Sequence, residues 1–149
     1  MPFLAGQIIT AGQLARMQPT PYMAAATSAL TTTTTTYADI PGTDIAVTTL
    51  AANATYTALG VFDCNVLGTS PSILMVGRLL VDGATDVGLA IHAMDTLDRD
   101  TVSMVWQGVL PAAGAHTFKL QGALTAALAS GGSFLQSDTR LQVTITEVV

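Results

Sequence analysis

The chain has 149 residues, of which half are hydrophobic and only 10% are charged, and its 5 basic and 10 acidic residues give a net charge of −5. This length predicts one domain with a hydrophobic core of its own, while the charge content is far below the roughly 25% of an average soluble domain. The five cations are dispersed, which excludes a nucleic-acid-binding protein, because binding phosphates needs clustered Lys and Arg.

The shortage of charge predicts a permanent oligomer, because interfaces are depleted in charged side chains. The alternative is a monomer whose surface carries unusually few charges. No run of 18 or more apolar residues indicates a membrane span, and residues 1–9 lack the basic start and long apolar stretch of a signal peptide. Synthesis and assembly in the cytoplasm are therefore expected. The single cysteine, Cys64, is expected to be a small buried hydrophobe.

Residues 1–23 are predicted to form an N-terminal arm. Thr10 is the expected N-cap of a two-turn helix, with Gln13 completing a capping box. So short a helix is not stable by itself in water, and it must dock on its own body or on another subunit. Residues 19–21, Pro-Thr-Pro, predict an extended linker. We interpret the arm as an anchor, the alternative being a packed extension of the domain. The predicted partner-binding residues are Phe3, Leu4, Ile8, Ile9, Leu14 and Met17.

Residues 24–149 are predicted to form an all-β body. Alternating hydrophobic patterns bounded by turn residues predict strands at residues 24–36, 45–50, 54–65, 73–81, 88–94, 101–110, 115–121 and 140–148. Residues 124–136 fit a helix or a strand. About eight antiparallel strands with no long amphipathic helix favour a β-sandwich of the jelly-roll type. No repeat of fixed period is visible, which disfavours β-helices and propellers.

Two of the predicted strands carry apolar residues on both faces. In residues 54–65, Leu59 and Val61 alternate with the face of Phe62, and in residues 101–110, Val105 and Val109 alternate with that of Trp106. A monomer would leave one of these faces in water. We therefore predict an oligomer interface at Leu59, Val61, Val105 and Val109.

The sequence offers little catalytic chemistry. His92 and His116 lack the spacing of a zinc site and are interpreted as core or interface histidines. Asp95, Asp98 and Asp100 do not fit a calcium loop, and Arg99 among them opposes a cation, so a solvated hairpin tip is expected. No nucleophile elbow or phosphate-binding loop occurs. We expect no enzyme activity, no catalytic residue, no metal and no cofactor.

Two groups of motifs carry a family resemblance. The opening, FLAGQIITAGQL at residues 3–14, resembles the start of many small structural proteins of tailed bacteriophages. The pieces LVDG (80–83), TVSMVW (101–106), GAHTFKL (114–120) and LQVTITE (141–147) are similar to β-rich virion proteins of actinobacterial phages, whose bodies resemble trimeric jelly-roll heads of the tumour-necrosis-factor type. This resemblance implies a virion surface location, an anchoring arm and a homotrimer, and it supplies no catalytic or binding residues.

Within this class, two functions compete. A capsid decoration, or cement, protein would lie as a trimer on the shell with its arm on the major capsid protein. A tail fibre or receptor-binding head would dock on a tail protein and touch the host, for example through a surface glycan. The decoration protein is favoured, because no coiled-coil or repeat shaft separates arm from body. A stand-alone carbohydrate-binding sandwich is a third alternative, with Tyr22, Tyr37 and Tyr56 as candidate aromatics.

Overall fold

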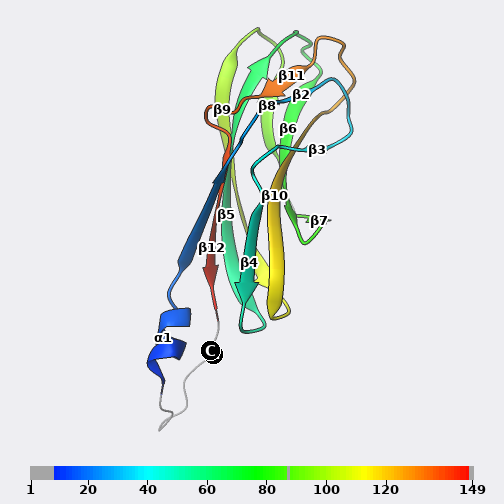
Figure 1. The fold of residues 1–149 in the computed structure, drawn as a ribbon. Coiled ribbons are helices and arrows are strands. Elements are labelled where there is room, and N and C mark those ends of the chain that lie inside the picture. Colours follow the sequence, from blue (N-terminus) through cyan, green and yellow to red (C-terminus); the bar gives the residue numbers. More distant parts are fainter. Residues whose placement is uncertain (1–8, 87, 148–149) are drawn as a thin grey trace.

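The computed structural model describes residues 9–86 and 88–147. Two antiparallel sheets lie face to face, and a short helix stands at one end of them (Figure 1). The described elements are α1 (Ala11–Arg16), β1 (Thr20–Ala25), β2 (Leu30–Thr32), β3 (Ala38–Asp39), β4 (Ile45–Thr49), β5 (Ala54–Val66), β6 (Leu74–Val81), β7 (Ala84–Thr85), β8 (Ala90–Ala93), β9 (Arg99–Leu110), β10 (Gly114–Leu124), β11 (Gly132–Phe134) and β12 (Arg140–Thr146).

The strand order is that of a jelly roll, which confirms the predicted fold class. In the sheet that we call sheet A, the order is β1-β12-β5-β9, and β11 and β2 continue beside the second half of β5. In sheet B the order is β4-β10-β6-β8, extended by the two-residue strands β3 and β7. Within the described ranges, eight strands have four or more residues, four in each sheet. Seven of them lie at predicted strands, whereas β1 overlaps the first predicted strand only at residues 24 and 25.

The core lies between the sheets, on the faces that the alternation predicted. Trp106 of β9, Phe118 of β10 and Leu141 of β12 are all buried, whereas their sequence neighbours on both sides are wholly or partly exposed. Three edge-to-face ring contacts fill the centre: Phe62 with Phe134 at 5.9 Å between centroids, Phe62 with Trp106 at 6.5 Å, and Tyr56 with Phe118 at 5.2 Å. Such pairs stabilise a core beyond the area that they bury.

The Thr-rich segment at residues 24–36 is not the single strand that β-propensity predicted. β1 ends at Ala25, and β2 covers only Leu30–Thr32. Beyond β2, the Thr32 hydroxyl accepts a hydrogen bond from the backbone of Thr34 at 3.4 Å, and the Thr34 hydroxyl accepts one from Thr36 at 3.3 Å. Such local bonds offer the backbone an alternative to a strand ladder.

Two further boundaries differ from the sequence-based expectation. The last two residues of the predicted linker, Thr20 and Pro21, already belong to β1 and pair with Ile145 and Thr144 of β12. In the ambiguous stretch at residues 124–136, β11 forms a short strand between β2 and β5. The first strand therefore begins four residues before its predicted start.

Candidate attachment and assembly surfaces

Helix α1 has the capping box that its sequence predicts. The Thr10 hydroxyl accepts a hydrogen bond from the Gln13 backbone at 3.2 Å, and the Thr10 backbone donates to Gln13 Oε1 at 2.9 Å. Each bond satisfies an amide group that the first turn would otherwise leave without a partner. The capping box defines where this short helix begins.

The apolar side chains of the arm are not buried against the body. No residue of α1 is buried, and Leu14 is 56% exposed. Ile9 is 37% exposed, and Met17 is half-buried. The other predicted anchor residues, Phe3, Leu4 and Ile8, lie outside the described residues. A helix of six residues that leaves its leucine in water gains little from its own domain.

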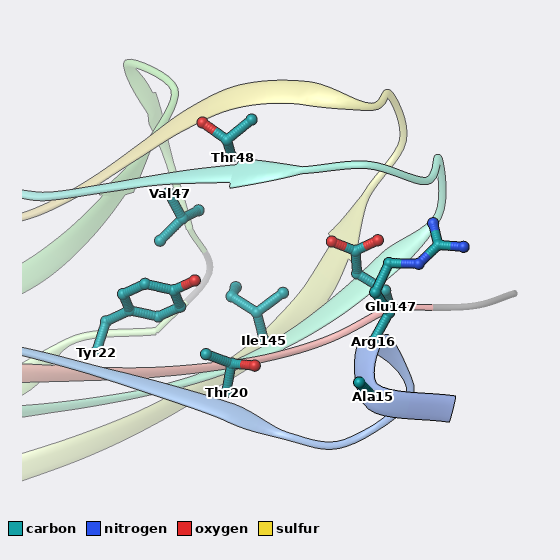
Figure 2. Close-up of a pocket in the computed structure, with 8 residues that line it drawn as sticks. All are labelled: Ala15, Arg16, Thr20, Tyr22, Val47, Thr48, Ile145 and Glu147. Atoms are coloured by element: carbon teal, nitrogen blue, oxygen red, sulfur yellow. The ribbon is translucent and has the colours of Figure 1, made fainter. Parts of the chain in front are cut away.

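A pocket separates the helix from the sandwich. It has a volume of about 200 Å³ and is lined by Ala15, Arg16, Thr20, Tyr22, Val47, Thr48, Ile145 and Glu147 (Figure 2). Glu147 connects the two sides: its backbone donates to the carbonyl of Arg16 at 3.4 Å, and its Oε1 accepts a hydrogen bond from the Leu50 backbone at 3.0 Å. Its Oε2 is buried with no hydrogen-bond partner among the described residues. Contact between α1 and the body is therefore sparse.

The four predicted interface residues lie together on the outer face of sheet A. Leu59 of β5 is directly opposite Val105 of β9. Val105 and Val109 are 51% and 54% exposed, and Leu59 and Val61 are half-buried. Their inward neighbours Tyr56, Ala58, Phe62 and Trp106 are buried in the core. Both strands thus carry apolar residues on both faces.

The strand register extends this surface across four strands, as a mixture of apolar and polar side chains that is nearly free of charge. We call it the sheet A face and define it by four rows: Met23-Gln142-Leu59-Val105, Pro21-Thr144-Thr57-Gln107, Thr146-Thr55-Val109 and Ala25-Arg140-Val61-Ser103. Arg140 is the only charged residue in these rows. A groove of about 440 Å³ crosses the face at Thr55, Thr57, Gln107 and Val109. Met23, 70% exposed, is a member that sequence reasoning missed, because it fell in the predicted arm and not in the predicted body.

A buried ion pair lies beside this face. Asp63 of β5 is 1% exposed, and its two carboxylate oxygens accept hydrogen bonds from Arg99 Nε at 2.8 Å and Nη2 at 2.6 Å. Next to it, Cys64 points into the core and is 1% exposed, as expected. Burial raises the pKa of the Cys64 thiol to about 12, helped by the negative charges of Asp63, Asp100 and Asp98. The thiol is therefore held in its protonated, unreactive form.

Both histidines are buried, and each has a carboxylate partner. His116 Nδ1 lies 2.7 Å from Asp82 Oδ2, and its Nε2 lies 3.0 Å from the Ala112 carbonyl. His92 lies with Nε2 3.0 Å from Asp98 Oδ1. The turn between β8 and β9 thus gives His92 a carboxylate that its own strand does not provide.

The three tyrosines are poor platforms for a sugar ring. Tyr56 is 7% exposed and donates its hydroxyl hydrogen to Asp86 Oδ2 at 2.6 Å. The guanidinium of Arg78 covers Tyr37 at 3.7 Å from the ring centroid. Tyr22 packs against the core.

The described part of the chain contains no helix that is both long and apolar enough to cross a lipid bilayer.

Comparisons with known proteins give a likeness of fold. No family model matches the chain, and no curated protein is similar in sequence. Dimeric latent PorU from Porphyromonas gingivalis aligns over 87% of this chain and 13% of its own, with a TM-score of 0.56 and 5% identity. Murine APRIL at pH 5.0 aligns over 85% of this chain and 98% of its own, with a TM-score of 0.52 and 11% identity. A chain of the T13 IBDV viral particle aligns over 86% of this chain and 31% of its own, with a TM-score of 0.51 and 12% identity.

These likenesses define the class of the protein. It is a jelly-roll β-sandwich with a short N-terminal helix, and its fold is similar to domains found in a virus particle and in APRIL. At these identities the comparisons concern the fold and not the activity.

Proposed function

We propose that this protein is a non-enzymatic structural protein of a bacteriophage virion. In this proposal it is a homotrimeric capsid decoration protein on the virion surface, bound to the major capsid protein through its N-terminal arm. The observation that carries the proposal is the sheet A face, which is nearly free of charge and exposes Met23, Val105 and Val109. The jelly-roll likeness to a chain of a viral particle supports the choice of class.

The sheet A face has the composition of a surface made to be covered. Large exposed apolar side chains in a contiguous patch mark interaction sites, and charge is depleted at the centre of protein interfaces. Because uncharged side chains such as Thr, Gln and Val cost less to desolvate than charged ones, a second copy of this chain is the matching occupant. In this proposal the trimer buries the sheet A faces and leaves the arms free for the shell.

The exposed arm supports attachment to a different partner. Leu14 and Ile9 gain little from the body of their own chain. A capsid subunit would supply the apolar contact that the sandwich does not. The carbohydrate-binding alternative is weakened because none of its three candidate tyrosines is an exposed platform.

The substitution Val105→Asp tests the trimer. We expect it to place a charge in the interface and to convert the trimer into monomers that keep the wild-type circular dichroism spectrum, as measured by light scattering coupled to gel filtration. Ile91→Asp is the matched control, because Ile91 is also 51% exposed but lies on β8 of sheet B. A wild-type monomer at micromolar concentration, or an unchanged oligomer in Val105→Asp, would contradict the proposal.

A cryo-EM reconstruction of the native virion tests the location. Three-fold density on the shell, with the arm over capsid subunits, is the expected result. Density at the tail would instead favour a fibre or receptor-binding head, and absence from the particle would contradict both functions. Leu14→Asp should remain trimeric yet fail to bind empty shells in a sedimentation assay, which separates attachment from assembly.

A further inference from the structure

The turn between β8 of sheet B and β9 of sheet A brings together three metal-ligating side chains. His92 is contributed by β8, Asp98 by the turn, and Asp100 by the first residues of β9. One ligand atom of each lies within 4.8 Å of the others. His92 is only 8% exposed, whereas Asp100 is exposed. The cluster is therefore an imidazole buried beneath two carboxylates.

Arg99 does not neutralise this cluster, contrary to the expectation from sequence. Successive residues of a strand point to opposite faces, so that Arg99 and Asp100 diverge. The Arg99 guanidinium lies against Asp63 at 2.6 Å and reaches Asp138 at 3.7 Å. The objection to a cation, that an arginine occupies the same turn, therefore does not apply to the folded chain.

We propose that His92, Asp98 and Asp100 form a binding site for a divalent transition-metal ion, for which Zn²⁺ is the natural probe. An imidazole nitrogen beside carboxylate oxygens favours Zn²⁺ over Ca²⁺, which prefers six to eight oxygen ligands. Three protein ligands leave at least one coordination position for water or for a group of another molecule.

The spacing of the two nearest ligand atoms agrees with this assignment. Bonds of about 2.0–2.2 Å from a common zinc ion place two ligand atoms about 3.0–3.5 Å apart at angles of roughly 90–110°. His92 Nε2 and Asp98 Oδ1 are 3.0 Å apart. Asp100 is exposed, which leaves its side chain room to turn towards the other two.

Asp98 is held in place by Thr96. The Thr96 hydroxyl donates to Asp98 Oδ2 at 2.8 Å, which leaves Oδ1 facing His92. A carboxylate ligand that is fixed by an outer hydrogen bond is the usual arrangement at a metal site.

A bound ion would link the two sheets. β8 belongs to sheet B and pairs with β6, whereas β9 belongs to sheet A and pairs with β5. The cluster lies at the end of the sandwich opposite α1, because the start of β9 pairs with the end of β5 and α1 lies near Leu50 and Glu147 (Figure 1). The ion would therefore act far from the proposed attachment site.

Calorimetric titration of the chelator-treated full chain with ZnCl₂ tests the site. We expect one ion per chain with a micromolar dissociation constant. Asp100→Asn, an exposed substitution that should not disturb folding, and His92→Gln should each weaken Zn²⁺ binding at least tenfold. Asp95→Asn is the matched control, because Asp95 is an exposed acid of the same turn outside the cluster, and its affinity should stay within twofold of wild type.

NMR provides a second measurement that does not depend on the variants. The ring signals of His92 should shift or broaden on addition of Zn²⁺, while those of His116 stay unchanged. Absence of binding, equal affinities for Zn²⁺ and Ca²⁺, or an equal loss of affinity in Asp95→Asn and Asp100→Asn would each overturn the proposal. Because the trimer is measured separately by light scattering, failure here would leave the proposed virion function standing.

Discussion

Asp63 is a buried carboxylate that needs a cationic partner. A carboxylate that is 1% exposed must be paired, because a buried charge without a partner is strongly destabilising. Arg99 is this partner: its Nε and Nη2 donate a bidentate pair of hydrogen bonds to the carboxylate, which is the strongest arrangement for these two side chains. The sequence could not reveal the pairing, because the two residues are 36 positions apart and meet only through the register of β5 and β9.

Arg99→Ala is predicted to destabilise the fold. The substitution leaves Asp63 buried without its cation, and we expect the melting temperature to fall by roughly 5–10 °C. Arg140→Ala, which removes an exposed arginine from the same sheet, is the control and should change the melting temperature by no more than about 2 °C. Differential scanning calorimetry of both variants and the wild type measures these melting temperatures. Equal shifts would mean that water, and not Arg99, stabilises the Asp63 carboxylate.

At the scale of the element, the strands that were predicted best are those with regular alternation. β5, β9, β10 and β12 each show an inward face of large apolar residues, and their bounds lie close to the predicted ones. β11 has no such pattern: its Gly132, Ser133 and Phe134 are all buried, because β2 and β5 flank it. The prediction of one strand at residues 24–36 was wrong for a different reason: local hydrogen bonds to Thr hydroxyls replace the strand ladder that β-branching favours.

Gly77 of β6 is predicted to be a glycine that the packing of the two sheets requires. A Cβ at this position would overlap the ring of Phe62 from the opposite sheet. Gly77→Ala should therefore destabilise the protein by about 1–3 kcal/mol through overpacking, as measured by urea unfolding. Gly12→Ala is the control, because a Cβ at Gly12 meets nothing within 4 Å. It should not lower the unfolding free energy, since alanine favours a helix more than glycine does. An unchanged free energy in Gly77→Ala would show that Phe62 moves aside freely.

The same scale explains how far the candidate sites were visible in the sequence. The exposure of the predicted interface residues Leu59 and Val105 on one face follows from alternation within single strands, so the sheet A face was partly predictable. Met23 joined it only through pairing of β1 with β12. The cluster of His92 with Asp98 and Asp100 was not predictable, because a single sequence shows neither the turn that folds back on β8 nor the direction in which Arg99 points.

At the scale of the whole molecule, a hydrogen bond between the two sheets makes the stability of the fold depend on pH. Tyr56 of sheet A donates to Asp86, which follows β7 of sheet B. Burial raises the pKa of the Tyr56 hydroxyl, and the hydrogen bond to Asp86 raises it further. As the pH rises, the Tyr56 hydroxyl therefore ionises in the unfolded chain before it ionises in the folded one. Its tyrosine has a pKa of about 10, so the contribution of this group to stability is complete below that pH and is lost as the pH rises above it.

We predict an alkaline loss of stability that depends on Tyr56. The urea midpoint of the wild type should fall between pH 9 and pH 11, because unfolding then releases the phenolic proton of Tyr56. Tyr56→Phe should be less stable at pH 8, where the hydrogen bond to Asp86 is lost, yet should show a shallower decline towards pH 11. Parallel declines in the two proteins would assign the alkaline loss to other groups.

The pairing of β1 with β12 has a practical consequence for displaying foreign peptides on this molecule. Thr20 lies opposite Ile145, so the chain enters and leaves the sandwich at the same end, beside α1 (Figure 1). A cargo fused after β12 would therefore crowd the proposed docking arm. The turn between β5 and β6 lies at the other end, and its Pro71 and Ser72 are exposed. A peptide inserted there, where exposed turns tolerate insertions best, would project away from whatever the arm holds.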